Sequence, residues 1–163
     1  MAMKSLDDLF THFLKDMYYA ERQILKALPG MSRKANSQQL RDALDHHREE
    51  TEQQIQNLEK IFELIGARAR GTTCPAMDGI IEEAKDIMSE AEDPRTRDAG
   101  MIGAAQAVEH YEITRYGTMI AWAKQLGMKD AVKLLQENLE QEKMADEKLT
   151  KLAEGIVNQK AAA

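Results

Sequence analysis

The sequence GARARGTTCPAMDGIIEEAKDIMSEAED, residues 66–93, separates two helical halves of the chain and decides how they can be arranged. Its first part, 66–76, contains two glycines and one proline but no periodic apolar positions, which is typical of a loop. Its second part carries Ile80, Ile81, Ala84 and Ile87 at helical spacing, which predicts a short helix within the connection. A segment of this length indicates a crossover rather than a tight turn.

The residues before the crossover predict two long helices. Ser5, followed by an acidic residue three positions later, is typical of a helix start, and apolar residues then recur every three or four positions. Pro29 and Gly30 predict a kink or an end of this first helix. Ser37 predicts the start of a second helix, which Gly66 should end.

The residues after the crossover predict two more helices. Asp93 as N-cap and Pro94 at the first helical position favour a helix that runs to about residue 126. Gly127 should end it, and a fourth helix should run from about residue 129 to 157. We expect the polar, alanine-rich tail, 158–163, to fray.

These connection lengths predict a single all-α domain over residues 1–163. Two tight connections make two antiparallel helix hairpins, and the crossover over 66–93 is long enough to span a bundle about 40 Å in length. It should bring the third long helix beside the second. A four-helix bundle with one such crossover is the ferritin-like architecture, and an ordinary bundle with a decorated loop is the alternative.

Composition and charge exclude several classes of function. The 163 residues carry a net charge of −6, which argues against a surface that neutralises nucleic-acid phosphates. The sequence offers no apolar run of about 20 residues, so we expect no membrane span. The single Cys74 and the absence of an apolar leader core near Met1 predict a cytoplasmic protein.

Four glutamates point most directly to chemistry, because each interrupts an otherwise apolar stripe near the middle of one long helix. They are Glu21, Glu50, Glu112 and Glu142. A buried carboxylate must be protonated, paired with a base or bound to a metal, and these stripes contain almost no basic residues. The pattern therefore predicts a metal site, with a buried salt-bridge network as the alternative.

The heights of these glutamates along the helices agree with one another. Glu112 lies 15 residues before Gly127 and Glu142 lies 15 residues after it, so the hairpin should place them side by side. Glu21 and Glu50 lie 13 and 16 residues from a turn near residue 34, within about one helical turn of each other. The four glutamates should form one layer.

Neighbouring residues extend the candidate ligand set. His47 precedes Glu50 by three positions, Glu109 precedes Glu112 by three, and Asp146 follows Glu142 by one turn. Asp146 and Gln54 could instead orient a ligand, and His47 could be a core histidine bonded to a carboxylate. A site rich in carboxylate favours iron or manganese over copper or zinc. The predicted metal ligands are Glu21, His47, Glu50, Glu109, Glu112, Glu142 and Asp146.

The motifs around these residues resemble those of the bacterial YciF-like stress-response proteins. They are Tyr19-Ala20-Glu21, His47-Arg48-Glu49-Glu50-Thr51, Glu109-His110-Tyr111-Glu112-Ile113 with Tyr116-Gly117, and Glu142-Lys143-Met144-Ala145-Asp146. The likeness covers nearly the whole chain and highlights the same seven residues. It implies a ferritin-like bundle with a di-iron-type centre, often in a dimer, and an association with stress responses. Gln54 stands where some relatives carry His.

The leading hypothesis is a protein with two metal ions, most readily iron and alternatively manganese, that acts on dioxygen, peroxide or Fe(II). Its activity would be catalase-like, peroxidase-like or ferroxidase-like. The alternative is a metal-stabilised helical scaffold or interaction protein without catalytic turnover, and iron storage in a hollow shell is a third reading. The expected partners are metal ions and a second copy of the chain, with neither nucleic acid nor a membrane.

Overall fold

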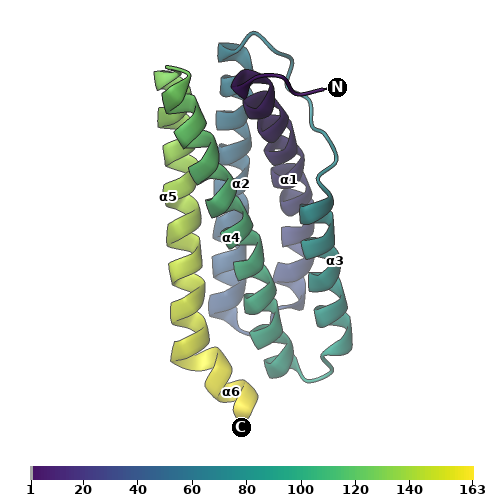
Figure 1. Ribbon diagram of the computed structural model, residues 1–163. Helices are drawn as coiled ribbons and strands as arrows, with labels where there is room; N and C mark the ends of the chain where they lie inside the picture. Colours follow the sequence, from purple (N-terminus) through teal and green to yellow (C-terminus); the bar gives the residue numbers. More distant parts are fainter. Residues whose placement is uncertain (1) are drawn as a thin grey trace.

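The computed structural model describes residues 2–163, and these are almost entirely helical (Figure 1). The helices are α1 (Leu6–Lys34), α2 (Gln38–Leu64), α3 (Pro75–Glu90), α4 (Pro94–Gln125) and α5 (Lys129–Leu152), followed by a π-helical turn, η1 (Ala153–Val157), and α6 (Asn158–Ala162). The all-helical class and the order of two helices, a crossover and two helices are confirmed. None of the helices described is long and apolar enough to span a membrane.

Most predicted helix ends are confirmed by local hydrogen bonds. The side chains of Ser5, Ser37 and Asp93 each accept a hydrogen bond from the backbone N–H three residues later. Gly66 and Gly127 have φ angles of 69° and 71°, in the left-handed region that glycine adopts most readily. The sequence signals therefore set where the two hairpin turns and the crossover lie.

Three boundaries differ from the sequence prediction. The first helix continues through Pro29 to Lys34, because buried residues on both sides of the proline, Leu28 and Met31, hold it against the core. The crossover helix α3 begins at Pro75, inside the expected loop, since proline is well suited to the first helical position. The tail expected to fray is helical over Asn158–Ala162 and packs against α4.

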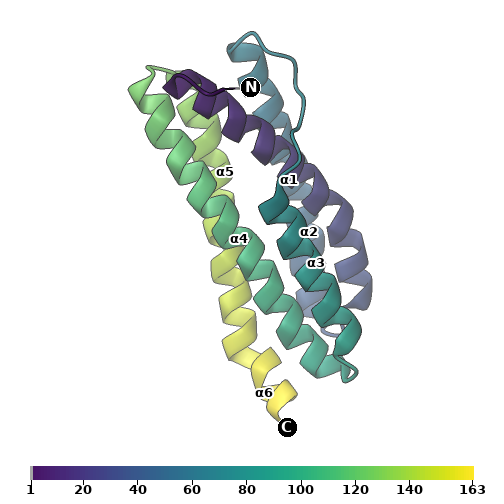
Figure 2. The same ribbon diagram turned by 45° about the vertical axis from the view of Figure 1, so that its right-hand side comes forward.

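The four long helices pack side by side, each against two others. α1 packs against α2, α2 against α5, α5 against α4 and α4 against α1 (Figures 1 and 2). The prediction that α4 lies beside α2 is wrong, because α4 packs against α1 and α5. In the observed order every pair of neighbouring long helices is antiparallel (Figure 1). Their dipoles therefore point in opposite directions, which is electrostatically favourable. α3 lies outside this group, along α4 and α1.

The buried apolar residues form two clusters at opposite ends of the long helices. The aromatic cluster, where α1 begins and α2 ends, includes Phe10, Tyr18, Phe62 and Tyr116. The aliphatic cluster, where α1 ends and α2 begins, consists of buried alanine, valine, leucine, isoleucine, methionine and cysteine side chains. In α2, α4 and α5 buried polar residues lie between the two clusters in chain order, whereas in α1 the buried Glu21 directly follows Ala20 of the aliphatic cluster.

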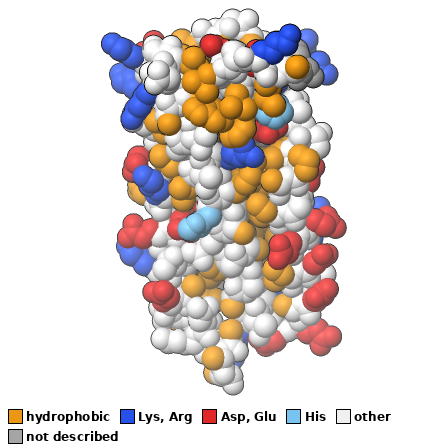
Figure 3. Space-filling model, viewed as in Figure 1, with side chains coloured by type: hydrophobic (Ala, Val, Ile, Leu, Met, Phe, Trp, Pro, Cys, Tyr) orange, Lys and Arg blue, Asp and Glu red, His pale blue; other side chains and the backbone are white. Residues whose placement is uncertain are grey.

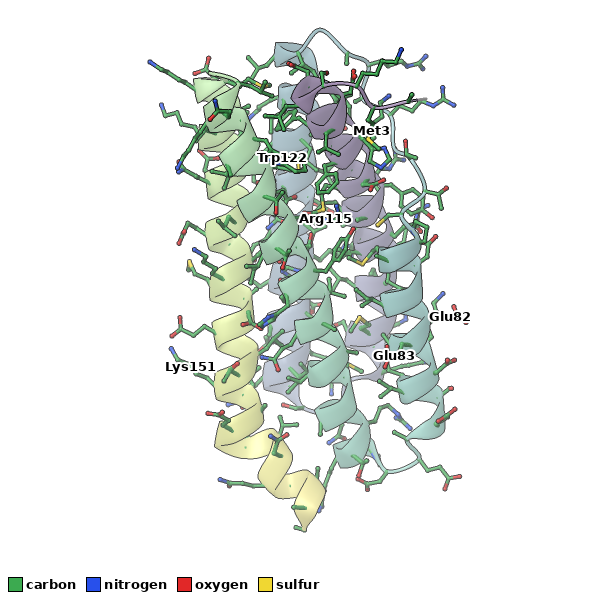
Figure 4. All side chains as sticks on the ribbon, in the orientation of Figure 1. Met3, Glu82, Glu83, Arg115, Trp122 and Lys151 are labelled. Atoms are coloured by element: carbon green, nitrogen blue, oxygen red, sulfur yellow. The ribbon has the colours of Figure 1, made fainter. Side chains whose placement is uncertain are left out.

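The surface reflects the same division. Hydrophobic side chains gather at the end where α1 begins (Figure 3), and Trp122 and Arg115 lie on that part of α4 (Figure 4). The centroids of the Phe13 and Trp122 rings are 4.7 Å apart. The Arg115 guanidinium lies over the Phe13 ring, with its Cζ atom 4.0 Å from the ring centroid. On α3 both Glu82 and Glu83 are exposed, and Glu82 points away from the other helices (Figure 4).

Candidate metal centre

Four buried side chains from three helices converge near the middle of the protein. They are His47 of α2, Glu109 and Glu112 of α4, and Glu142 of α5, and one potential ligand atom of each lies within 4.8 Å of the others. His47 is the most exposed, at 7%. The structure therefore brings together four of the seven residues that the sequence singled out.

Helical spacing explains how these side chains meet. Glu109 and Glu112 are three residues apart on α4 and so share a face. Glu142 is level with Glu112 across the turn at Gly127, as the equal spacing predicts. His47 reaches them from α2, with its Nε2 atom 3.0 Å from Oε1 of Glu109.

Glu21 is fully buried and stands at one end of a chain of buried hydrogen bonds. The Tyr116 hydroxyl donates to Oε1 of Glu21 at 2.5 Å, and the Asn138 amide donates to the Tyr116 hydroxyl at 3.2 Å. The Asn57 amide in turn donates to Oδ1 of Asn138 at 2.9 Å. Neither asparagine was among the predicted site residues. A signal existed for Asn138, which interrupts the apolar stripe one turn before Glu142.

Glu50 lies at the edge of the centre and contacts both His46 and His47. Its Oε2 atom is 3.4 Å from Nδ1 of His47, and its Oε1 atom is 2.8 Å from Nε2 of His46. The side chain of Glu50 is 15% exposed. His47 is thus placed between two carboxylates, Glu50 at one ring nitrogen and Glu109 at the other.

Asp146 does not join this group. Its Oδ2 atom lies 3.0 Å from Nε2 of His110, and its Oδ1 atom accepts a hydrogen bond from Gln106. The His110 side chain is 68% exposed, as expected for a residue that faces away from the centre. Gln54 is fully buried and donates to Gln141 at 3.1 Å, a contact suited to supporting the centre.

Several buried carboxylate oxygens have no hydrogen-bond partner within residues 2–163. They are both oxygens of Glu112 and of Glu142 and one oxygen each of Glu21 and Glu109. Within residues 2–163, no lysine or arginine nitrogen lies within 4 Å of the carboxylates of these four glutamates. The one basic side chain at that distance is His47, which contacts Glu109. Buried polar atoms are rarely left unpaired, so this set of oxygens fits bound cations.

Burial and mutual repulsion raise the pKa of most of these carboxyl groups. Burial raises the pKa of Glu112 well above its ordinary value, and the nearby carboxylates of Glu142 and Glu21 raise it further. The pKa of Glu142 is raised well above its ordinary value by burial and then by Glu109. Burial also raises the pKa of Glu21.

His47 and Glu109 instead form an ion pair. Burial opposes charge on His47, but Glu109 and Glu50 outweigh it, and the pKa of His47 is raised well above its ordinary value. Burial likewise opposes charge on Glu109, yet His47 outweighs it and lowers the pKa of Glu109. Cations that bind at the centre would therefore compete with protons on Glu112 and Glu142 and with the positive charge on His47.

Comparisons with known proteins agree with the resemblance seen in the sequence. Residues 5–162 match the family described as Domain of unknown function (DUF892). Protein YciF of Escherichia coli (strain K12) is 44% identical over 162 residues, which cover 99% of this chain and 98% of YciF. No reaction follows from these names.

Solved structures show the same fold. The crystal structure of the E. coli stress protein YciF matches with a TM-score of 0.91 over 96% of this chain and 99% of that one, at 44% identity. YcfI from Rhodopseudomonas palustris, for which a structural role has been suggested, matches with a TM-score of 0.89 over 90% of this chain and 94% of that one, at 48% identity. A protein from Xanthomonas campestris, 23% identical, shares the fold at 0.73 over 94% of each chain. The chain therefore belongs to the DUF892 family of YciF-like proteins.

Proposed function

We propose that this protein binds two metal ions, iron or manganese, and acts on dioxygen, peroxide or Fe(II) in a stress response. The observation that carries the proposal is the set of buried, unpaired carboxylate oxygens on Glu21, Glu109, Glu112 and Glu142. In this proposal α1, α2, α4 and α5 form a ferritin-like four-helix bundle around the ions, the protein is a cytoplasmic homodimer, and it binds neither nucleic acid nor a membrane.

The donor chemistry supports hard, oxygen-loving ions. Five glutamates and one histidine would hold them: Glu21, His47, Glu50, Glu109, Glu112 and Glu142. Carboxylates outnumber imidazoles, which favours iron or manganese over zinc or copper. Two divalent ions would balance most of this negative charge, whereas a single ion would leave several carboxylates buried and uncompensated. Asp146, the seventh predicted ligand, contacts His110 instead and lies outside this set.

The surrounding residues hold the ligands in place. Tyr116 fixes one oxygen of Glu21, and Asn138 fixes Tyr116 in turn. Glu50 fixes the ring of His47 through Nδ1 and leaves Nε2 directed toward Glu109. Bound iron or manganese would supply one-electron redox chemistry, and His47 is placed to hold a proton beside it.

The association with stress rests on similarity to E. coli YciF, which is described as a stress protein. Redox chemistry would follow from bound iron or manganese, because both ions change oxidation state readily. Removal of oxidants and control of reactive iron are both consistent with such a centre.

Metal content tests the proposal directly. Full-length protein dialysed anaerobically against Fe(II), or separately against Mn(II), should retain about two ions per chain by elemental analysis. Glu112→Gln should lower the affinity about tenfold or more, because it removes a charged ligand from a dry site. Glu49→Gln is the matched control, since the Glu49 side chain is 81% exposed. Absence of bound metal, or equal binding by both variants, would contradict the proposal.

A structural role without turnover is the second candidate. YcfI, 48% identical to this chain, is the relative for which such a role has been suggested. A scaffold of this kind would bind metal and gain stability from it, yet would turn over neither peroxide nor dioxygen when loaded. Steady-state assays of the loaded protein with hydrogen peroxide separate the two candidates.

A further inference from the structure

A cavity of about 500 Å³ lies within the aliphatic cluster and reaches the candidate metal centre. All five main helices contribute to its lining, which is mostly apolar, and Leu28, Leu44 and Leu149 are among the lining residues. His47 and Glu109 also line it. Its volume lies within the range of about 300–1,000 Å³ that is usual for small-molecule sites.

Small residues on several helices create this space. Where the aromatic cluster places rings, the cavity is bordered by residues with small side chains or none: Ala27, Gly30, Ala43, Ala104, Ala105 and Ala145. The apolar lining of a space that opens to solvent faces water unless a ligand covers it, which is unfavourable. The cavity is therefore suited to holding a ligand with an apolar body.

The wall that meets the metal centre is polar and almost completely buried. Glu109 is 1% exposed, and its Oε2 atom has no hydrogen-bond partner within residues 2–163. His47, paired with Glu109, stands beside it on the same wall. A molecule in the cavity would therefore lie against the residues proposed to hold the ions.

The exposed charges at the cavity are positive, although the chain as a whole carries a net charge of −6. Four exposed lysines line it: Lys26 and Lys34 of α1, Lys85 of α3 and Lys148 of α5. Lys85 lies 4.0 Å from Glu82, whereas no carboxylate of residues 2–163 comes within 4 Å of the other three. The carboxylates on the wall, Glu50 and Glu109, already pair with histidines.

We propose that the cavity binds a single-chain amphiphile with an anionic head group, such as a free fatty acid. Its aliphatic chain would fill the apolar space and approach the metal centre, and its carboxylate would remain at the lysines. This inference deepens the proposed function by naming a substrate class, and it depends on that function for any chemistry at the chain but not for binding. A neutral apolar ligand would leave the lysines unused.

Matched amphiphiles test the proposal. Delipidated protein is titrated with dodecanoate, dodecanol and dodecyltrimethylammonium, the two ionic probes below their micellar concentrations and dodecanol below its solubility limit. Binding is followed by calorimetry and native mass spectrometry. Dodecanoate should saturate at one molecule per chain, and the cationic probe should bind at least about tenfold more weakly. Equal binding of all three probes, no saturable dodecanoate binding, or binding seen only with anionic phospholipid vesicles would overturn the proposal.

Variants locate the ligand. Ala105→Phe should fill the cavity and weaken dodecanoate binding about tenfold or more. Gly30→Leu is a second filling variant, since a Cβ atom there would meet only the end of the Arg33 side chain, at 3.8 Å. Gly103→Leu is its control, on an exposed part of α4 with nothing within 4 Å. Unchanged dodecanoate binding in both folded filling variants would overturn the assignment to this cavity.

Charge reversal tests the head group, and metal analysis separates the two proposals. Lys34→Glu combined with Lys148→Glu should weaken dodecanoate binding about fivefold or more. Lys151→Glu, outside the cavity and paired with Glu147, should not change it (Figure 4). Protein that binds dodecanoate but no metal would support this inference and contradict the proposed function. Protein that binds metal but no dodecanoate would overturn this inference alone.

Discussion

The aromatic and aliphatic clusters are built from the same four long helices, yet they are filled differently. The aromatic cluster contains the fully buried rings of Phe10, Phe62 and Tyr116. The aliphatic cluster contains small and flexible side chains and borders a cavity of about 500 Å³. The buried carboxylates between them thus face dense packing on one side and open space on the other. We infer from this difference that the aromatic end supports the layer through packing and that the cavity at the aliphatic end is the side from which a small molecule would approach it.

The largest expected effect compares one substitution in the two clusters. Leu58→Ala and Leu44→Ala alter the same residue type on α2, and both side chains are buried. Leu58 belongs to the aromatic cluster, so its truncation should cost about 4–5 kcal/mol. Leu44 borders the cavity, so we expect its truncation to remove fewer packing contacts and to cost about 2–3 kcal/mol. Urea unfolding of both variants measures the difference, and equal losses would contradict a looser aliphatic end.

The next effect concerns the layer between the clusters and its response to pH. The pKa values of Glu112 and Glu142 are raised in the folded, metal-free protein. Their protons therefore stabilise the fold fully below the ordinary glutamate pKa of 4.5, and this contribution is lost as the pH rises toward the folded-state values. The free energy of unfolding of metal-free protein should fall with rising pH, by up to about 1.4 kcal/mol per pH unit for each retained proton.

Urea unfolding between about pH 5 and pH 8 measures this slope. The raised pKa of His47 acts in the same direction, whereas the lowered pKa of Glu109 gives stability that is lost only as the medium becomes acidic. Metal-loaded protein should lack the fall over this range, since the ions replace the protons. A metal-free protein that becomes more stable toward pH 8 would contradict the raised pKa values of Glu112 and Glu142.

A smaller change in stability is expected when Glu112, one member of that layer, is replaced by a neutral residue. Glu112→Gln keeps the shape of the side chain but cannot ionise, so it should stabilise metal-free protein near neutral pH by about 1–2 kcal/mol. The same substitution should remove most of the stability gained from added Fe(II). Thermal unfolding with and without metal measures both effects. Stabilisation by Glu112→Gln in the presence of metal as well would show that Glu112 is not a ligand.

Much of the fold could be predicted because its signals are local. Ser5, Ser37 and Asp93 mark helix starts through short-range hydrogen bonds, and Gly127 marks a turn through its backbone freedom. The neighbours of α4 could not be predicted in this way. The crossover length makes α4 parallel to α2, but whether α4 lies beside α2 or α1 depends on how the four apolar faces meet.

The candidate site shows the same limit. Equal spacing about Gly127 predicts that Glu112 and Glu142 meet, because both distances are counted along one hairpin. Asp146 follows Glu142 by one turn, yet its carboxylate lies against His110, a contact between helices that spacing on one helix does not reveal. Asn57 carries no sequence signal comparable to a carboxylate. The cavity depends on small residues of five helices, whose combined effect appears only after packing.

The smallest expected effect compares helix caps at the two ends. The hydroxyl of Ser5, at the aromatic end, accepts a hydrogen bond from the backbone of Asp8 at 3.1 Å, and Ser5→Ala should cost about 1 kcal/mol. Ser37, at the aliphatic end, caps α2 through a longer bond of 3.3 Å. There the buried carboxylate of Asp98 also accepts two backbone N–H groups, from Asn36 and Ser37, at 2.8 Å each.

Because Asp98 holds this turn without help from the Ser37 hydroxyl, Ser37→Ala should cost about 0.5 kcal/mol, less than Ser5→Ala. Thermal unfolding of Ser5→Ala, Ser37→Ala and Asp98→Asn measures the stability that each substitution removes. Asp98→Asn should be the costliest of the three, since the amide can accept only one of the two backbone hydrogen bonds with its oxygen. A larger loss for Ser37→Ala than for Asp98→Asn would show that the hydroxyl, and not the carboxylate from α4, fixes the aliphatic end.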